Sequence, residues 1–576
     1  FGSPFCAETA VRPVTVLQEV DMGEQRLIRH RMRRREFLRR GAVAGAGIAG
    51  AAAFGCGRSA APGGGSGASG SASRTAAAKP GGTLTLNLND NPPSLNLWTE
   101  FTYLVARSIA PVYNQLLQVD PMDESKIIPD LAKSWEYTNA DKTEIVFKLQ
   151  DASITFHDGK PFTVEDVKAT YDWLRSPPKG VTSQRTTAAR NIDAIESPDA
   201  KTVKFRLKTP AASFTNSIAS HHFPMGAKHV IDQSNTLLDA QQRPIGTGPF
   251  VFKDWKRDNV VDMERNKAYW RPNRPYLDAI SAFIIQENAT GVTNLLGGQL
   301  LIYGPLLTSD VARVQKEMSG KGTVTVRPSL GRLAVIPNGA RPPFNDVRMR
   351  EALSAALERD DLNKVIYEGR GLKGAYSVAK GAWTLPDSEI AKFSGYDGKA
   401  DLQKAKQLMA AAGYPNGFKG KMPVRQDFED RGIAVQASLK KAGFDFDVEV
   451  LKSAVFTQRV LTPDWDALTH VWATSFDDPD DSFTEMLISP DRAGRNWANI
   501  TIPEVDRLFD QQRVEFDTEK RKKLVADMDK AAMAKYPNLI IVYQPQLQAQ
   551  YNTVKDYVLH VSNLTNQRYE NVWLAQ

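Results

Sequence analysis

Residues 156–167 read FHDGKPFTVEDV and predict a tight turn followed directly by a helix. Asp158-Gly159 between apolar residues is a turn signal, because glycine accepts the positive φ that such turns need. Thr163 can cap a helix whose first turn carries acids, and apolar residues at 164, 167, 171 and 174 then share one helix face. The stretch therefore predicts a strand, a turn and a helix with one buried face.

Further elements alternate on both sides of this stretch. Runs of alternating or β-branched apolar residues predict strands at 82–88, 145–149, 203–207, 251–255, 444–451 and 465–472. Helices are expected after Asp346, after Asp401 as far as Gly413, and after Asp517. We expect the first of these to be buried through residues 347, 352, 353, 356 and 357. Strands alternating with helices predict an α/β protein.

The amino-terminal region carries an export signal. Residues 33–40 read RRREFLRR, and an Ala/Gly-rich run leads from there to Cys56. Paired arginines before such a run are typical of the twin-arginine route, and the run is shorter than the ~20 residues that span a bilayer. A cysteine at the cut site indicates a lipoprotein acylated on Cys56, although Ala53 replaces the leucine usual at such sites. We expect residues 1–55 to be an upstream segment plus this signal, and residues 56–80 to be a flexible tether.

Composition excludes some functions for the remaining chain. The formal net charge is +7, but +4 of it lies in residues 1–55, so residues 56–576 are nearly neutral and do not suggest nucleic-acid binding. With Cys6 removed and Cys56 acylated, no disulfide or thiolate metal site is expected. His221, His222 and His229 could converge on a metal, but their spacing matches no usual zinc pattern, so we expect no metal and no cofactor.

Six phrases occur in a recognisable order along the chain. They are IPDLAKSWE at 128–136, FHDGKPFTVEDV at 156–167, GTGPF at 246–250, ERNKAYW at 264–270, PPFNDVRMREAL at 342–353 and AAGYPNGF at 411–418. This ordered set resembles the family 5 extracellular solute-binding proteins of ABC importers, the group that binds oligopeptides, dipeptides and nickel. The resemblance extends from about residue 81 to about residue 573.

The resemblance implies a two-lobed periplasmic-binding-protein-like α/β fold of type II, cluster C, with an extra inserted small domain. Lobe I is then expected to comprise 81–117, 225–325 and 545–576, the inserted domain 118–224, and lobe II 326–544. A ligand would bridge the lobes and stabilise their closed form, which the permease and ATPase of the importer would receive.

The resemblance also places the ligand contacts. It implies a loop after the first strand, with Phe101, Thr102 and Tyr103, and a strand end with His470 and Trp472. A tryptophan there could stack on a sugar or cover a peptide side chain, but both residues could equally be core residues.

One departure from the family pattern bears on the ligand. In oligopeptide binders an aspartate three residues after this tryptophan holds the α-amino group of the peptide, but here the position is Ser475. The lost charge-assisted bond is worth about 1.5–3 kcal/mol. Asp477 or Asp478 could take its place from slightly further along the chain. The ligand is therefore expected to be a peptide, a peptide-like compound or an oligosaccharide.

Four further residues are weaker candidates for ligand contact. Arg459 could anchor a carboxylate through both guanidinium edges, or it could lie on a solvated helix face. Trp383 and Asn496 rank with Arg459 below the contacts named above, and Tyr303 follows a segment that departs from the family pattern.

Two other functional classes are alternatives. A secreted hydrolase is disfavoured because the sequence has neither Gly-x-Ser-x-Gly nor His-Glu-x-x-His. A ligand-binding component of a sensory system would need a partner chain. The sequence predicts a monomeric, non-enzymatic solute-binding lipoprotein, tethered outside the cytoplasm through Cys56.

Overall fold

The computed structural model describes residues 78–575, apart from 101, 182, 184, 378–380, 382, 463, 475, 493–495 and 563. The predicted export signal, Cys56 and most of the tether therefore lie outside the described residues, as do Phe101 and Ser475.

A ten-stranded sheet connects the two lobes. Its strand order is β14-β13-β15-β12-β16-β11-β1-β10-β9-β8. In chain order these strands are β1 (Thr83–Leu88), β8 (Phe250–Lys256), β9 (Val260–Arg265), β10 (Ala279–Ile284), β11 (Ile302–Tyr303), β12 (Gly322–Pro337), β13 (Phe418–Arg425), β14 (Phe444–Leu451), β15 (Ala467–Ala473) and β16 (Leu539–Tyr551).

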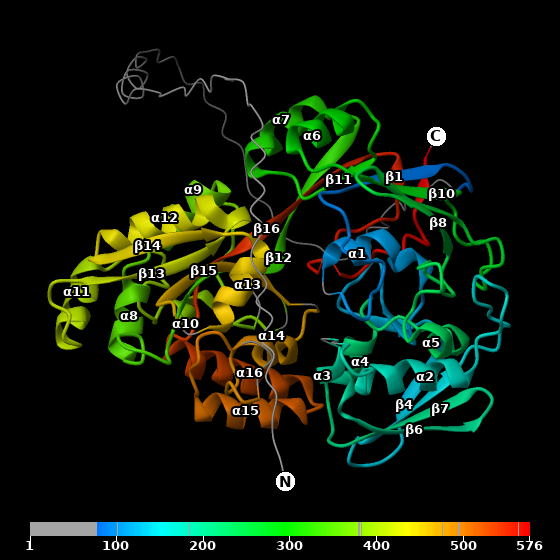
Figure 1. Ribbon diagram of the computed structural model, residues 1–576, viewed down its shortest axis with the longest axis horizontal. Coiled ribbons are helices and arrows are strands. Elements are labelled where there is room, and N and C mark those ends of the chain that lie inside the picture. Colours follow the sequence, from blue (N-terminus) through cyan, green and yellow to red (C-terminus); the bar gives the residue numbers. More distant parts are fainter. Residues whose placement is uncertain are drawn as a thin grey trace, which may run out of the picture. The chain divides into compact units, whose positions relative to one another are not determined.

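The two longest strands, β12 and β16, run antiparallel through the middle of this sheet (Figure 1). The two strands pair with each other. In addition, the carboxyl-terminal portion of β16 pairs with β11, and the carboxyl-terminal portion of β12 pairs with β15. The predicted lobe boundaries at 325/326 and 544/545 fall inside these two strands. Their register breaks between Pro328 and Arg332, so the pairing is interrupted where the chain passes from one half of the sheet to the other.

A separate four-stranded sheet lies within the segment predicted as an inserted domain. Its order is β4-β5-β7-β6, from β4 (Ala132–Tyr137), β5 (Glu144–Leu149), β6 (Ile192–Asp199) and β7 (Thr202–Leu207). A two-stranded sheet of β2 (Leu117–Val119) and β3 (Ile127–Pro129) precedes it, and β17 (Val554–Lys555) pairs with β18 (Trp573–Leu574) near the end of the chain.

Helices occupy the connections between the strands. Before β12 they are α1 (Tyr103–Ile109), α2 (Val164–Arg175), α3 (Thr186–Ala189), α4 (Phe214–Ile218), α5 (Lys228–Ser234), α6 (Asn288–Leu296) and α7 (Val311–Glu317), with the 3-10 turns η1 (Ala110–Val112) and η2 (Thr308–Asp310). After it they are α8 (Val347–Ala355), α9 (Arg359–Tyr367), α10 (Asp387–Ile390), α11 (Leu402–Ala411), α12 (Glu429–Lys440), α13 (Ser453–Leu461), α14 (Pro479–Met486), α15 (Pro503–Arg513) and α16 (Thr518–Met533), with η3 (Gln426–Phe428).

The stretch at 156–167 folds as predicted. Gly159 has φ +85°, and Thr163 and Asp166 form a reciprocal capping box at the start of α2. Val164, Val167, Tyr171 and Leu174 are buried. The helix after Asp346 also forms, but the expected burial of Val347 is wrong: its side chain is 36% exposed. As the first residue of α8 it faces away from the core, and the buried face begins instead at Met349.

The recurring phrases carry structure. In GTGPF, a Cβ on Gly246 would come within 2.1 Å of the Val112 carbonyl oxygen, and one on Gly248 within 2.4 Å of that of Pro111. The absence of side chains lets this turn pack directly on η1. In IPDLAKSWE, buried Asp130 accepts from the side-chain amide of Asn114 at 2.9 Å and pairs with the Arg271 guanidinium at 2.9 Å.

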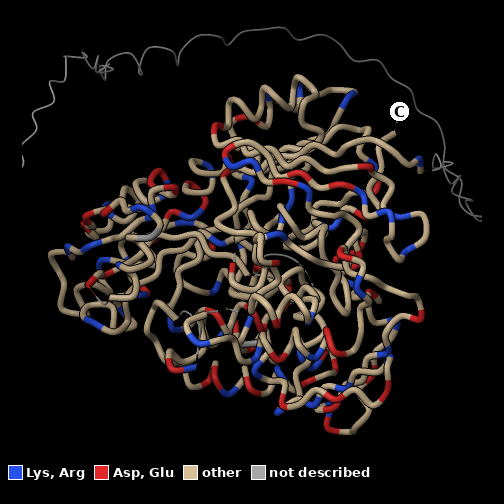
Figure 2. Tube along the Cα trace, turned by 45° about the vertical axis from the view of Figure 1, so that its right-hand side comes forward, with Lys and Arg blue, Asp and Glu red and all other residues tan. Residues whose placement is uncertain are grey.

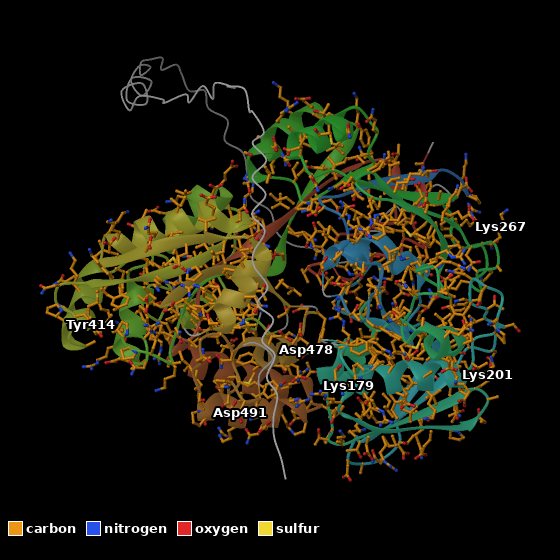
Figure 3. The ribbon with its side chains drawn as sticks, viewed as in Figure 1. Lys179, Lys201, Lys267, Tyr414, Asp478 and Asp491 are labelled. Carbon is orange, nitrogen blue, oxygen red and sulfur yellow. The ribbon has the colours of Figure 1, made fainter. Side chains whose placement is uncertain are left out.

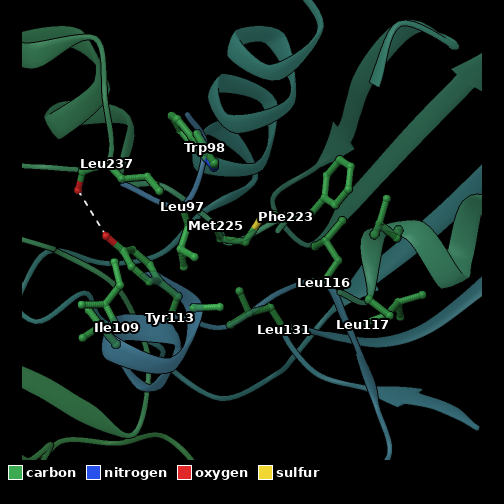
Figure 4. Packing of buried hydrophobic residues seen from close by; sticks show 14 of the residues in the cluster. Leu97, Trp98, Ile109, Tyr113, Leu116, Leu117, Leu131, Phe223, Met225 and Leu237 are labelled. Carbon is green, nitrogen blue, oxygen red and sulfur yellow. Dashed lines mark hydrogen bonds between the residues drawn. The ribbon is translucent and has the colours of Figure 1, made fainter. Parts of the chain in front are cut away.

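One continuous core lies under α1 and the inserted domain. Leu97, Trp98, Leu116 and Phe223 pack together there (Figure 4). Tyr113 is fully buried in the same cluster, and its hydroxyl donates to the Leu237 carbonyl at 3.5 Å. On the surface, basic and acidic residues are interleaved along the described chain (Figure 2), in agreement with its near-neutral composition.

Candidate functional site

A cavity of about 330 Å³ opens where β12 and β16 lose their register. We call it the hinge cavity. Its floor is the break in β12 at Ser329–Gly331 and the segment Gln544–Gln548 of β16. A Cβ on Gly331 would come within 2.5 Å of the Gln544 side chain, so glycine permits the close approach of the two strands at this point. Tyr103 and Arg107 of α1 form one wall, and Ala473 and Thr474 at the end of β15 belong to another.

Two further cavities adjoin the hinge cavity. One of about 620 Å³, the lateral cavity, shares Val561 and Ser562 with it and is lined by Glu124, Trp383 and Asp477 among others. The third cavity, of about 580 Å³, shares four residues with the hinge cavity. They are Pro305, which precedes η2, and Gln544, Pro545 and Leu547 of β16. The three cavities form a cleft whose walls come from both lobes and from the strands that connect them.

Three predicted site residues meet in this cleft. Tyr103 lines the hinge cavity, and Trp383 and Asp477 line the lateral cavity. Thr102 stands directly beside Tyr103, where its hydroxyl accepts from the Leu104 amide at 3.0 Å and caps α1. The loop after the first strand therefore positions a helix whose first residue faces the cleft.

His470 and Trp472 lie on β15 just before the cleft but are largely buried. Trp472 is 7% exposed, and the Arg332 guanidinium stacks 4.2 Å from its ring centroid. The His470 ring packs against Phe456 at 5.1 Å and Trp497 at 5.2 Å. Neither residue is among the described residues that line the three cavities.

The structure places three other candidates in structural roles outside these cavities. Arg459 forms ion pairs with Glu449 at 2.8 Å and Asp464 at 3.0 Å. The Asn496 side-chain amide donates to main-chain carbonyls of residues 488 and 500. Tyr303 is buried in a hydrophobic cluster, and its hydroxyl donates to the Asn288 side chain at 2.9 Å.

The sequence interpretation missed the basic side chains of the cleft. Arg107 and Arg425 line the hinge cavity, and Arg327 lines the lateral one. A signal for Arg107 was present in the sequence, because it follows Tyr103 by four residues and so shares its helix face. No comparable local pattern marks Arg327 or Arg425, which reach the cleft from strand positions defined only by tertiary pairing.

Asp477 is the most perturbed acid of the cleft. Burial, together with the negative charges of Asp478 and Glu124, raises its pKa to about 7, and Arg332 opposes the rise. Its Oδ1 has no hydrogen-bond partner within the described part of the chain. The next residue, Asp478, caps the start of α14 (Figure 3) and forms an ion pair with Arg521 at 2.6 Å. This ion pair anchors the backbone beside Asp477, whose own side chain lines the lateral cavity.

Charged and polar contacts join the inserted domain to lobe II across the cleft. The Ser213 hydroxyl donates to Asp480 at 2.6 Å, and the Asn216 amide donates to Asp478 at 3.2 Å. The ring of Tyr137 on β4 meets Phe516 edge-on at 5.2 Å. On the hinge itself, Arg327 pairs with Glu124 of the inserted domain at 2.5 Å. These contacts join segments that lie far apart in the sequence.

Comparison with known proteins identifies this architecture. The sequence matches the bacterial extracellular solute-binding proteins, family 5 Middle, over residues 126–494. The chain belongs to this family.

Relatives within the solute-binding proteins cover most of the chain. The oligopeptide-binding protein AppA of Bacillus subtilis is 26% identical over 449 residues, which are 73% of this chain and 79% of the relative. The dipeptide-binding protein of Escherichia coli is 24% identical over 525 residues, 86% of this chain and 95% of the relative. These matches place the chain among the binding proteins of ABC transporters.

Solved structures confirm the two-lobed fold. The periplasmic binding protein DppA from Helicobacter pylori, solved with the peptide STSA, superposes with a TM-score of 0.74 at 23% identity, covering 86% of this chain and 99% of that one. AgaA from A. tumefaciens R10, solved with agropinic acid, superposes with a TM-score of 0.73 at 22% identity, covering 86% of this chain and 99% of that one.

Two of the three histidines considered above as metal ligands have structural partners in this solute-binding protein. His229 pairs with Asp158 at 2.6 Å, and His221 accepts from the Gln567 amide at 3.0 Å. Within the described ranges no cluster of three or more His, Cys, Asp or Glu could hold a metal ion. The same ranges contain no helix with the length and apolarity to cross a membrane.

Proposed function

We propose that this solute-binding protein captures one small-molecule ligand in the cleft between its lobes and delivers it, in the closed form, to the permease and ATPase of an ABC importer. The cleft carries the proposal: three adjoining cavities surround the register break of β12 and β16, with walls from both lobes. Binding energy gained from both walls stabilises the closed form. No covalent step is assigned, and we expect no catalytic turnover.

The proposed division of the chain into lobes follows the connectivity of the ten-stranded sheet. Segments 81–117, 225–325 and 545–576 make lobe I, segment 118–224 the inserted domain, and segment 326–544 lobe II. The crossing at 544/545 lies opposite the register break of β12, and the crossing at 325/326 lies a few residues before that break; interrupted pairing there leaves the strands freer to bend. We place the hinge there.

The proposed ligand is a peptide, a peptide-like compound or an oligosaccharide. Relatives in the family are named for oligopeptides and dipeptides, and one similar structure holds agropinic acid. In the lateral cavity Trp383 offers an aromatic ring and Asp477 a carboxyl group with an unused oxygen. We propose that Asp477 receives a hydrogen-bond donor of the ligand, as an ammonium group would supply, in compensation for Ser475.

The proposed contacts are therefore Tyr103, Trp383 and Asp477, with Thr102 positioning the first of them. Trp472 supports the cleft from behind through its stack with Arg332, so we expect it to act on binding through the position of β15.

Thermal unfolding of residues 81–576 against peptides, oligosaccharides and metal complexes tests the function. A ligand at 100 times its dissociation constant adds about 2.7 kcal/mol to the unfolding free energy, which gives a clear rise in the midpoint. Small-angle X-ray scattering should show a more compact particle with the same ligand. Conversion of a bound compound to product without a membrane partner would favour the hydrolase alternative. The absence of binding across the panel would contradict the transport function.

We also propose that the protein is exported by the twin-arginine route and held as a monomer at the outer face of the membrane through lipid on Cys56. The arginine pairs of residues 33–40 and the Gly/Ser-rich stretch after Cys56 support this. Replacing Cys56 by Ser should release the protein from the membrane fraction. Its retention there would contradict the lipid anchor.

A further inference from the structure

Arg107 is a buried cation without a counter-charge in the described structure. It lies in the last turn of α1 and is only 7% exposed. Its Nε and Nη2 atoms have no hydrogen-bond partner among the described residues, and no carboxylate of those residues lies within 4 Å of it. Its positive charge acts on the hydroxyls of Tyr103, Tyr557 and Tyr569. These hydroxyls are neutral, because burial raises their pKa values.

Other buried arginines of the chain donate hydrogen bonds to side chains around them. Arg332 donates to the Tyr543 hydroxyl at 2.6 Å and to the Ser482 hydroxyl at 2.7 Å. Arg521 is paired with Asp478 at 2.6 Å. A guanidinium removed from water without such partners is costly, because it loses hydration and gains nothing in exchange. Placement near the carboxyl end of a helix favours a cation only weakly, and that effect does not require burial.

The hinge cavity gives this cation a place to find a partner. Arg107 lines the cavity, and the lining residues that the structure describes include no aspartate or glutamate. The second arginine of the lining, Arg425, is neutralised by Asp427 through two bonds of 2.5 Å. The net charge of the cavity wall is therefore positive, and its excess resides on Arg107.

The unused atoms form the edge of the guanidinium that suits a carboxylate. Nε and Nη2 point the same way and can donate two parallel hydrogen bonds to two oxygens. The same chain uses this edge elsewhere: Arg459 donates from Nε to Glu449 Oε2 at 3.1 Å and from Nη2 to Glu449 Oε1 at 3.1 Å. Around Arg107, Gln544, Gln546 and Gln548 of β16 add amide groups that can hydrogen-bond to the remainder of such a ligand.

We propose that Arg107 binds a carboxylate of the transported ligand in the hinge cavity, so that the protein selects acids over their neutral analogues. The proposal rests on the transport function above and specifies its substrate class. It places the anionic end of the ligand at the hinge, beside α1, and leaves the lateral cavity around Asp477 for the opposite end.

Succinate and its uncharged diamide, succinamide, are the probes for this subsite. Thermal midpoints are measured for the wild type, Arg107→Gln and the control Arg313→Gln, which removes an equal charge from an exposed pair on α7. We expect succinate, but not succinamide, to raise the midpoint of the wild type and of Arg313→Gln. The half-saturating succinate concentration should rise at least tenfold in Arg107→Gln, because bonds to a charged group are lost. An equal response of the wild type to both probes, or none, would overturn the proposal.

The ligand-free variants separate binding from a structural role. Without ligand, Arg107→Gln should unfold at the same temperature as the wild type or higher, because it removes an unpaired buried charge. A midpoint several degrees lower, with the succinate response retained, would identify Arg107 as a structural residue and overturn the proposal. Arg107→Lys supplies a second variant that keeps the charge and loses the paired donors, and its succinate response should fall between those of the wild type and Arg107→Gln.

Matched larger ligands distinguish this proposal from the transport function. The tripeptide Ala-Ala-Ala and its carboxamide are compared on the wild type, together with neutral and acidic oligosaccharides. Equally tight binding of a neutral member would leave the transport function standing and refute the Arg107 subsite. A response to succinate without binding of any larger solute would support the subsite and contradict the transport function.

Discussion

Replacing Asp477 by Asn should stabilise the ligand-free protein, and by more at high pH than at low pH. Burial and two neighbouring negative charges raise the pKa of this carboxyl from 3.8 to about 7. The folded protein therefore binds this proton more tightly than the unfolded protein does. The contribution of the protonated carboxyl to the free energy of unfolding is fully present below about pH 4 and is lost as the pH rises through 7. Linkage gives a cost of about 1.5 kcal/mol at pH 5 and about 4 kcal/mol at pH 8.

The amide introduced by Asp477→Asn cannot ionise and avoids this cost. The advantage of the variant over the wild type should thus grow by about 2–3 kcal/mol between pH 5 and pH 8, with partial solvent access reducing this figure. Urea unfolding of both proteins at both pH values measures it, and the double difference cancels every other titrating group. The matched control is Asp445→Asn, a surface acid of β14 paired with Lys440. A double difference below about 0.5 kcal/mol would refute the argument that Asp477 is desolvated in the closed cleft.

Three further replacements test the cleft and its supports. Trp472→Ala should destabilise lobe II by about 3–5 kcal/mol in urea unfolding, because a buried ring is removed from the core; a cost below about 1 kcal/mol would mean that the ring is exposed to the cleft. Gly248→Ala should lower the thermal midpoint by several degrees, since its Cβ would lie 2.4 Å from the Pro111 carbonyl oxygen, and an unchanged midpoint would contradict that close packing. Ser213→Ala removes the hydroxyl bond to Asp480 and should weaken ligand binding several-fold in calorimetry with little change in the unfolding of the open protein; equal affinity would show that this contact does not support closure.

Local sequence signals predicted the elements well where the signal and the structure depend on neighbouring residues. Thr163 and Asp166 form their capping box because both lie within one turn, and Gly413 ends α11 with φ +94° for the same local reason. Val347 was misplaced because its apolar side chain fits the helical spacing, but the first residue of a helix can face outwards without disturbing the rest of the stripe. Periodicity gives the face of a helix, and tertiary packing decides where that face begins.

The candidate site was predictable only in part. Tyr103, Trp383 and Asp477 line the cavities of the cleft, and the resemblance had indicated the approximate positions of Tyr103 and Asp477 but not that of Trp383. Arg459 had the right chemistry for a carboxylate, but its partner proved to be Glu449 on the adjacent strand β14, ten residues earlier. Arg107 was missed for the complementary reason. The sequence shows a charged residue among apolar neighbours in α1, but only the structure shows that this residue is buried and lines a cavity.

Asp477 and Arg107 give closure a dependence on the ligand. Asp477 comes from lobe II and Glu124 from the inserted domain, and the negative charge of Glu124 contributes to the raised pKa of Asp477. Closure without ligand therefore brings two acids together near pH 7, while Arg107 loses water in the hinge cavity without gaining an anion from the described residues. Both costs disfavour the empty closed form, and a ligand with a carboxylate at one end and a donor at the other removes both. Since a ligand shifts a two-state equilibrium only by its differential affinity, unpaired charges in the empty site increase that difference. The same residues that make the empty site unstable thus make closure selective for a ligand of matching charge.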